Sequence, residues 1–348
     1  MTNFHRSTYV NPKHHFPKGL MNLVAVSASL SLLLGVLLME TPGTANVVVQ
    51  DAAARKLERD LKAFKIPPAW IHEVRPKWDT RRPWKEARQE IRRLLSIGTE
   101  STRREGIRLT WDYLKKRDIG NGHEYPLNLF LSGEKLWAIH AYRQYLNRGD
   151  KDWPHFGIPD LASLYIEFGS YKEAEKLLKI GLGIRHPKRE YEAMTYASIY
   201  DTMGDLYVAW GKRRDAVKSY QLSIRMFSQA RPPYGAHLMP RRAKGVQSKL
   251  DLLSMSSLKS ARLKDGTFRA KALGYTGDVN LTVTIRSGRI ADIRVQHQEK
   301  IDQNACVIVP KAIVDNQTLK VDAISGATVT QDAITVGTLR ALQQAGLK

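Results

Sequence analysis

The chain has 348 residues, 55 Lys and Arg against 34 Asp and Glu, and one cysteine, Cys306. This length suggests roughly two or three domains, and 43% hydrophobic residues exclude a disordered tail protein. A single cysteine excludes an intrachain disulfide framework, Cys-x-x-Cys-His haem attachment, all-cysteine iron–sulfur ligation and zinc modules that need paired cysteines.

The N-terminal part predicts a membrane segment. Residues 20–39 carry no charge, and their number matches the length that a membrane-spanning helix needs. Basic residues stand before this run, and Glu40 follows it. The positive-inside rule makes residues 1–19 a cytoplasmic basic tail and places residues 46–348 on the extracytoplasmic, periplasmic side of an inner or cell membrane.

A cleaved signal peptide is the alternative to a single-pass anchor. Gly43, Thr44 and Ala45 resemble a small-residue cleavage site, although signal peptides have apolar regions of only about 7–15 residues. Both interpretations export residues 46–348, and an oxidising compartment is compatible with the near-absence of cysteine.

Residues 46–83 form a Pro- and Trp-rich linker region. Residues 51–66 have helical periodicity, with Leu57, Leu61 and Phe64 on one stripe. Four prolines exclude a continuous helix in the remainder of the region. Its tryptophans predict packing on a neighbouring element in preference to a position at the membrane surface.

Residues 84–264 are predicted to be all-α. Residues 160–182 and 201–224 resemble each other at an offset of 42 residues: an aromatic residue closes a helix, Gly169 or Gly211 allows a tight turn, and Ala174 or Ala216 permits close approach. These stretches resemble tetratricopeptide repeats, so we expect a helical-repeat scaffold. An irregular helical bundle is the alternative.

The charge belongs to this middle part. Residues 46–264 carry +17 of the net charge of +21, together with all 7 tryptophans. The excess predicts either a docking surface for anionic lipid headgroups or an acidic protein, or a solvated helical surface. We predict no nucleic-acid partner, because the part is exported and has no aromatic–basic stacking motif. The histidines of the middle part stand singly, and no metal site is predicted.

Residues 265–348 change character and predict a small α+β domain. Alternating apolar residues predict strands at 267–273, 279–285 and 289–295, with Ser287 and Gly288 in a tight turn. An apolar stretch interrupted by Pro310 follows, and then an amphipathic helix at 330–347 with Thr330 as its N-cap. The predicted buried face of this helix contains Ala333, Ile334, Val336, Leu339, Leu342 and Ala345.

The motif Asp-x-x-Ser-Gly-Ala-Thr at residues 322–328 stands directly before that helix. Small residues let the backbone approach a ligand closely, and a helix N-terminus favours a phosphate group. The loop at residues 273–277 offers a second surface of close approach. An ordinary strand-to-helix turn with small residues is the alternative to a phosphate site.

The order of elements over residues 265–347 resembles the FMN-binding domain family, which includes flavin subunits of sodium-pumping quinone reductases and of Rnf-type ferredoxin oxidoreductases. In that family the last threonine of the motif accepts FMN through a phosphoester bond, which a separate flavin transferase makes from FAD with Mg²⁺. The resemblance implies that Thr328 carries covalent FMN. It assigns further cofactor contacts to Asp322, Ser325, Gly326, Ala327, Gly274, Tyr275, Gly277 and Glu299.

The resemblance therefore implies a membrane-anchored extracytoplasmic flavoprotein that transfers electrons to or from a redox partner protein at the membrane. An oxidoreductase component is expected in preference to a stand-alone enzyme, because the chain has no nicotinamide fingerprint. The alternative is a tetratricopeptide-like adaptor whose flavin domain binds FMN loosely or is vestigial.

Overall fold

The computed structural model describes residues 42–119, 122–147, 157–254, 262–274, 276–299, 302–321 and 327–347. The chain divides into two compact units, Met1–Ala45 and Asn46–Lys348. The predicted membrane segment at 20–39 lies outside the described residues. Among the helices of the described ranges, none has the length and apolar character that a membrane crossing requires.

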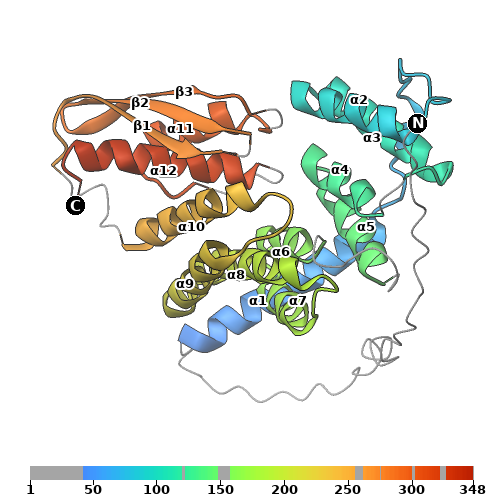
Figure 1. The fold of residues 1–348 in the computed structure, drawn as a ribbon, viewed down its shortest axis with the longest axis horizontal. Coiled ribbons are helices and arrows are strands. Elements are labelled where there is room, and N and C mark those ends of the chain that lie inside the picture. Colours follow the sequence, from blue (N-terminus) through green and yellow to red (C-terminus); the bar gives the residue numbers. More distant parts are fainter. Residues whose placement is uncertain are drawn as a thin grey trace, which may run out of the picture. The chain divides into compact units, whose positions relative to one another are not determined.

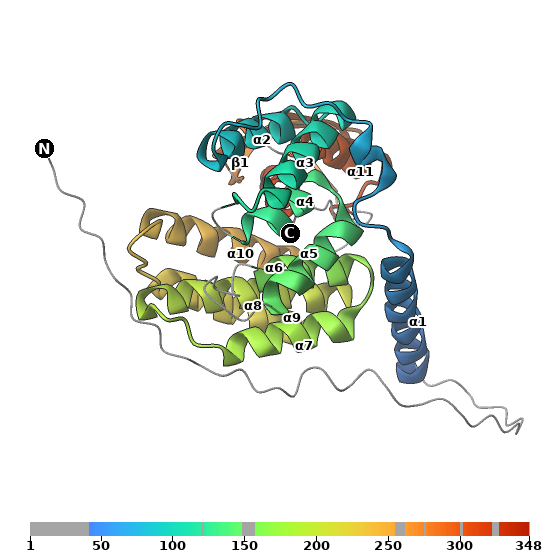
Figure 2. The ribbon, with the colours of Figure 1, turned by 90° about the vertical axis from the view of Figure 1, so that its right-hand side faces the viewer.

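Helices make up the described residues from 42 to 254 (Figures 1 and 2). Their bounds are α1 (Pro42–Ala63), η2 (Ala69–His72), α2 (Trp84–Ile97), α3 (Glu100–Lys115), α4 (Glu124–Ser132), α5 (Lys135–Asn147), α6 (Gly157–Glu167), α7 (Tyr171–Gly183), η4 (Arg189–Tyr191), α8 (Glu192–Ala209), α9 (Arg213–Gln229), η5 (Ala236–Leu238) and α10 (Met239–Ser254). Consecutive helices contact each other in the pairs α2–α3, α4–α5, α6–α7 and α8–α9. The predicted all-α middle part is therefore confirmed.

The two similar stretches of sequence fold as helix hairpins. Gly169 and Gly211 have φ angles of 70° and 74°, a left-handed conformation that ends the first helix without a Cβ clash. Ala174 and Ala216 are fully buried in the second helices. The hairpin geometry that the sequence indicates is thus present, while a relation to tetratricopeptide repeats stays a prediction.

The Pro- and Trp-rich region packs on the helices. Helix α1 is longer at its start than predicted and ends at Ala63, ahead of the two prolines that follow. Ile71 is fully buried in the same core as α1, and Trp70 makes an edge contact with Trp137 at a ring distance of 6.4 Å. Trp84 Nε1 donates a hydrogen bond of 2.7 Å to Glu124 Oε2. These tryptophans therefore contact protein, as predicted.

The C-terminal residues form one three-stranded antiparallel sheet with two helices on one face (Figure 1). The elements are β1 (Gly266–Leu273), β2 (Asp278–Arg286), β3 (Arg289–Gln296), α11 (Ala305–Asn316) and α12 (Thr328–Gln344). Apolar residues alternate along β2, and all those facing the helices are buried. Gly337 lets α12 approach the sheet, because a Cβ there would lie 2.2 Å from Leu281 Cδ1.

Two local predictions for this domain are wrong. Pro310 does not break the chain but lies inside α11, where its ring is buried with the apolar face of the helix. That burial offsets the helical hydrogen bond that proline cannot make. Thr330 is not the N-cap, because α12 begins at Thr328 after Ala327, and Thr330 lies within its first turn. The buried face predicted for α12 is confirmed at all six positions.

Lys249 on α10 lies between carboxylates of α8 and α12. Its Nζ is 3.0 Å from Asp201 Oδ1, 2.8 Å from Asp205 Oδ2 and 3.2 Å from Asp332 Oδ2. The Tyr220 hydroxyl donates to Asp205 Oδ1 at 2.7 Å. Burial raises the pKa of Asp201 and Asp332 to about 6, and the attraction of Lys249 offsets this only in part. One ammonium group thus links the helical part to the second turn of α12.

We expect Asp332→Asn to flatten the pH dependence of stability. Because the pKa of Asp332 lies above its ordinary value of 3.8, the folded chain binds the proton more tightly, and stability falls as the pH rises from about 4 through about 6. Across this pH range the wild type should lose roughly 1 kcal/mol more of its free energy of unfolding than the variant. This value is discounted for solvent screening, because the Asp332 side chain is 38% exposed.

Urea unfolding of both proteins on either side of this pH window measures the difference. Asp160, whose pKa burial also raises to about 6, titrates in both proteins and cancels in the comparison. Asp201 titrates in the same window and shares Lys249 with Asp332, so the measured difference includes the response of Asp201. Equal losses of stability in wild type and variant would contradict the raised pKa of Asp332.

Candidate functional site

The turn between β1 and β2 is built for close approach. Gly274 N donates to Gly277 O at 2.8 Å, which closes the turn after Leu273 pairs with Asp278. Gly274 is buried, and a Cβ on it would lie 2.5 Å from Glu299 Oε1 and 2.8 Å from Val279 Cγ2. The glycine is therefore required so that the Glu299 carboxylate can lie against the backbone of this turn.

Glu299 joins three segments of the domain. It follows β3, and its Oε1 accepts a hydrogen bond of 2.8 Å from Thr276 N. Its Oε2 accepts one of 2.6 Å from the Thr330 hydroxyl in the first turn of α12. Thr330 is 1% exposed, so this bond is shielded from water. The carboxylate fixes the β1–β2 turn against the start of α12, and its charge is favourable at a helix N-terminus.

The start of α12 provides an anion-binding geometry. Ala327 is the residue before the helix, is 3% exposed, and its carbonyl accepts a hydrogen bond from Gln331 N at 2.9 Å. The N–H groups of residues 328–330 come before this first helical hydrogen bond, so the helix itself provides no acceptor for them. They and the helix dipole favour a phosphate at Thr328.

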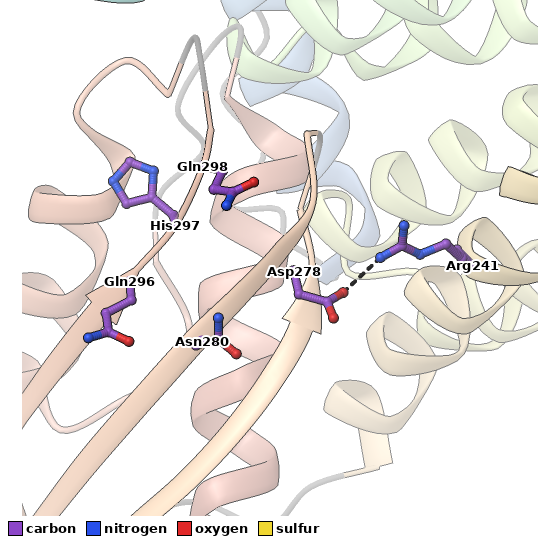
Figure 3. Close-up of a pocket in the computed structure, with 6 residues that line it drawn as sticks. All are labelled: Arg241, Asp278, Asn280, Gln296, His297 and Gln298. Carbon is purple, nitrogen blue, oxygen red and sulfur yellow. Dashed lines mark hydrogen bonds and ion pairs between the residues drawn. The ribbon is translucent and has the colours of Figure 1, made fainter.

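A polar cavity of about 400 Å³ lies beside the same turn (Figure 3). It is lined by Arg241, Asp278, Asn280, Gln296, His297 and Gln298. Asp278 Oδ1 is 2.8 Å from Arg241 Nη2 of α10, and hydrogen bonds from Lys271 and Arg241 lower the pKa of this carboxyl. The helical part therefore contributes a cation at the edge of the C-terminal domain.

The structure brings together part of the predicted site. Gly274 packs against the Glu299 carboxylate, and Gly277 closes the same turn through its carbonyl. Thr330, two residues after the start of α12 at Thr328, donates to the same carboxylate. The remaining predicted residues, Tyr275, Asp322, Ser325 and Gly326, lie outside the described residues. The sequence interpretation missed Thr330 and Thr276 as partners of Glu299, and no spacing signal links residues so distant in the chain.

Gly274→Ala is expected to lower the free energy of unfolding by about 1–3 kcal/mol, because the new methyl group displaces Glu299 or Val279. Gly277→Ala is the matched control in the same turn. No atom of its described surroundings lies within 4 Å of a Cβ there, so the expected change is below about 0.5 kcal/mol. Urea unfolding measures both, and equal losses would contradict the close packing of Glu299 on Gly274.

The residues present fit the phosphate end of FMN. The small buried Ala327 and the amides at the start of α12 are the features that such a group requires. Thr328 opens the helix at this point.

Known proteins are similar to parts of this chain. A segment of the chain is 36% identical over 88 residues to the NADH:acrylate oxidoreductase of Vibrio harveyi. The aligned segment is 24% of this chain and 9% of that protein. An uncharacterized protein of Treponema pallidum (strain Nichols) is 30% identical over 154 residues, 43% of each chain. The chain thus matches less than half the length of either relative. No solved structure matches.

A family match covers about a fifth of the chain. Residues 274–343 match the FMN-binding domain, from the glycine turn after β1 nearly to the end of α12. These bounds include the β1–β2 turn, Glu299 and the first turn of α12. The C-terminal domain is therefore an FMN-binding domain, and its cofactor is FMN.

Proposed function

We propose that the protein is an extracytoplasmic, membrane-anchored flavoprotein that carries FMN on Thr328 and exchanges electrons with a redox partner protein. The observation that carries the proposal is the start of α12 within the FMN-binding match, where Thr328 is the first helical residue and Thr330 in the same turn bonds to Glu299. When bound, FMN supplies the electron-transfer chemistry, and the protein supplies position and electrostatics.

The residues of the chain have separate tasks in this proposal. Thr328 supplies the hydroxyl oxygen that forms the phosphoester bond, and the amides of the first turn bind the phosphate oxygens. Glu299 holds the Gly274 turn against α12 through Thr276 and Thr330.

Covalent attachment would depend on a separate flavin transferase. A threonine hydroxyl is a weak nucleophile until a base or metal activates it. In the proposed step the Thr328 oxygen attacks the FMN phosphorus of FAD, AMP leaves, and the hydroxyl proton passes to a base of the transferase. A covalent link suits an exported protein, since a free cofactor would be diluted outside the cell.

The membrane location rests on the uncharged run at 20–39 and its basic flank. Helix α1 begins three residues after this run, so the anchor would hold the helical part and its basic residues close to the bilayer. Membrane fractionation followed by protease treatment of spheroplasts tests this. Digestion of residues 46–348 from outside is expected, and protection of them would contradict the orientation.

The electron-transfer function has a direct test. Full-length protein coexpressed with a flavin transferase should be yellow, lose its visible absorption under anaerobic dithionite, and regain it with a quinone acceptor. The observed relation to an NADH:acrylate oxidoreductase is compatible with a redox role, but the aligned part is 9% of that protein. A colourless protein that still binds a partner would instead support the helical adaptor with a vestigial flavin domain.

A further inference from the structure

Three side chains with different metal-binding atoms converge beside the flavin domain's functional end. A ring nitrogen of His297, a carboxylate oxygen of Asp302 and the Cys306 sulfur all lie within 4.8 Å of one another. His297 directly follows β3, Asp302 precedes α11, and Cys306 is the second residue of α11. No metal site is predicted from the sequence, because the histidines of the middle part stand singly and the chain has one cysteine.

This set of atoms selects a class of metal. Nitrogen, carboxylate oxygen and thiolate sulfur together are typical ligands of Zn²⁺, whereas Mg²⁺ and Ca²⁺ prefer oxygen ligands alone. We propose that His297, Asp302 and Cys306 bind one Zn²⁺ ion per chain. Three protein ligands leave a fourth tetrahedral position for water or another ligand.

The present hydrogen bonds of these side chains leave room for the ion. Asp302 Oδ1 accepts from Asn304 N at 3.2 Å, and Asp302 Oδ2 accepts from Cys306 N at 3.3 Å. The Cys306 side chain also bonds to Asp302, and ligation of the thiolate would replace this bond. A carboxylate has about four lone-pair positions, so it can still offer one to a metal. His297 Nδ1 accepts a long hydrogen bond of 3.2 Å from Glu299 N, which ligation at this nitrogen would replace.

The loop between Asp302 and Cys306 is held by two helices of the helical part. Gln303 and Asn304 are consecutive non-glycine residues with φ angles of 48° and 60°, a costly conformation that surrounding contacts must maintain. Gln303 Oε1 accepts from Arg103 Nη1 of α3 at 3.3 Å, and Gln303 Nε2 donates to Leu131 O of α4. The helical part thus fixes the turn that gathers the three ligands.

His297 is oriented for this role. In Figure 3 its ring points away from Asp278 and Arg241, so it is separate from the ion pair at the other side of the cavity. The ring is exposed, and an ion can reach it from solvent. Because Glu299 lies two residues further along the chain, bound Zn²⁺ would stiffen the segment that supports the start of α12.

Calorimetric titration of the full-length protein with Zn²⁺ tests the site, in a His14→Ala and His15→Ala background that removes the adjacent N-terminal histidines. One ion per chain is expected. Cys306→Ser and His297→Ala should each weaken the affinity by at least about tenfold, and the exposed His237→Ala is the control without effect. The titration measures Zn²⁺ binding and does not require bound FMN, so its result is independent of flavin loading.

Co²⁺ gives a second readout. A thiolate-to-cobalt absorption band should appear with the parent protein and disappear in Cys306→Ser. The control variant His237→Ala should leave this band unchanged. Absence of saturable Zn²⁺ binding, or binding that Cys306→Ser and His297→Ala leave unchanged, would overturn the proposal.

Discussion

Replacing Lys249 by methionine is expected to lower the free energy of unfolding by about 2–4 kcal/mol. The substitution leaves the carboxylates of Asp201, Asp205 and Asp332 close together without their common cation. The expected loss is below the ~3–5 kcal/mol of a fully buried ion pair, because these carboxylates are 27% to 40% exposed and take up some water.

Lys244→Met is the control for Lys249→Met, since Lys244 is exposed on the same helix. Its expected effect is within about 0.5 kcal/mol. Urea unfolding at neutral pH measures both variants. Equal stabilities of the two would contradict the role of Lys249 in joining α8, α10 and α12.

Thr328→Ala is expected to abolish covalent flavin. The alanine lacks the hydroxyl oxygen that the proposed phosphoester bond requires, whereas Thr328→Ser keeps it and should retain attachment. In-gel flavin fluorescence after denaturation reads out the covalent fraction of each variant coexpressed with a flavin transferase. Thr318→Ala, in the same domain but outside α12, should be labelled like the wild type. Fluorescence that persists in Thr328→Ala would contradict the assignment.

Local patterns predicted the secondary structure well. The strands of the C-terminal domain agree with the prediction to within one residue at each end, because apolar alternation and the Ser287–Gly288 turn are local signals. The buried face of α12 follows from helical spacing alone. Gly169 and Gly211 mark the helix hairpins by another local signal, because a left-handed turn favours glycine.

The errors arise where tertiary packing decides. Pro310 is a helix breaker by local rules, yet burial of its ring within the domain core keeps it inside α11. Thr330 has the residue type of an N-cap, but its hydroxyl donates to Glu299, which is 31 residues away in sequence. Local preference is a weak guide where a distant carboxylate offers a shielded partner.

The candidate site was predictable only as far as its motif. The glycine turn and the acidic position after β3 came from the family resemblance, and the structure shows that they touch each other. The Lys249 cluster could not be predicted, because its carboxylates come from helices separated by more than a hundred residues. The gathering of His297, Asp302 and Cys306 depends on two consecutive left-handed residues, and of these only Asn304 has a residue type that favours this conformation.

Peptide mass spectrometry of the full-length protein, coexpressed with a flavin transferase, tests the central claim most directly. The peptide containing Thr328 is expected to gain the mass of one FMN less one water, with fragmentation that places the group on Thr328. An unmodified Thr328 peptide, or FMN found on another residue, would contradict covalent attachment at Thr328.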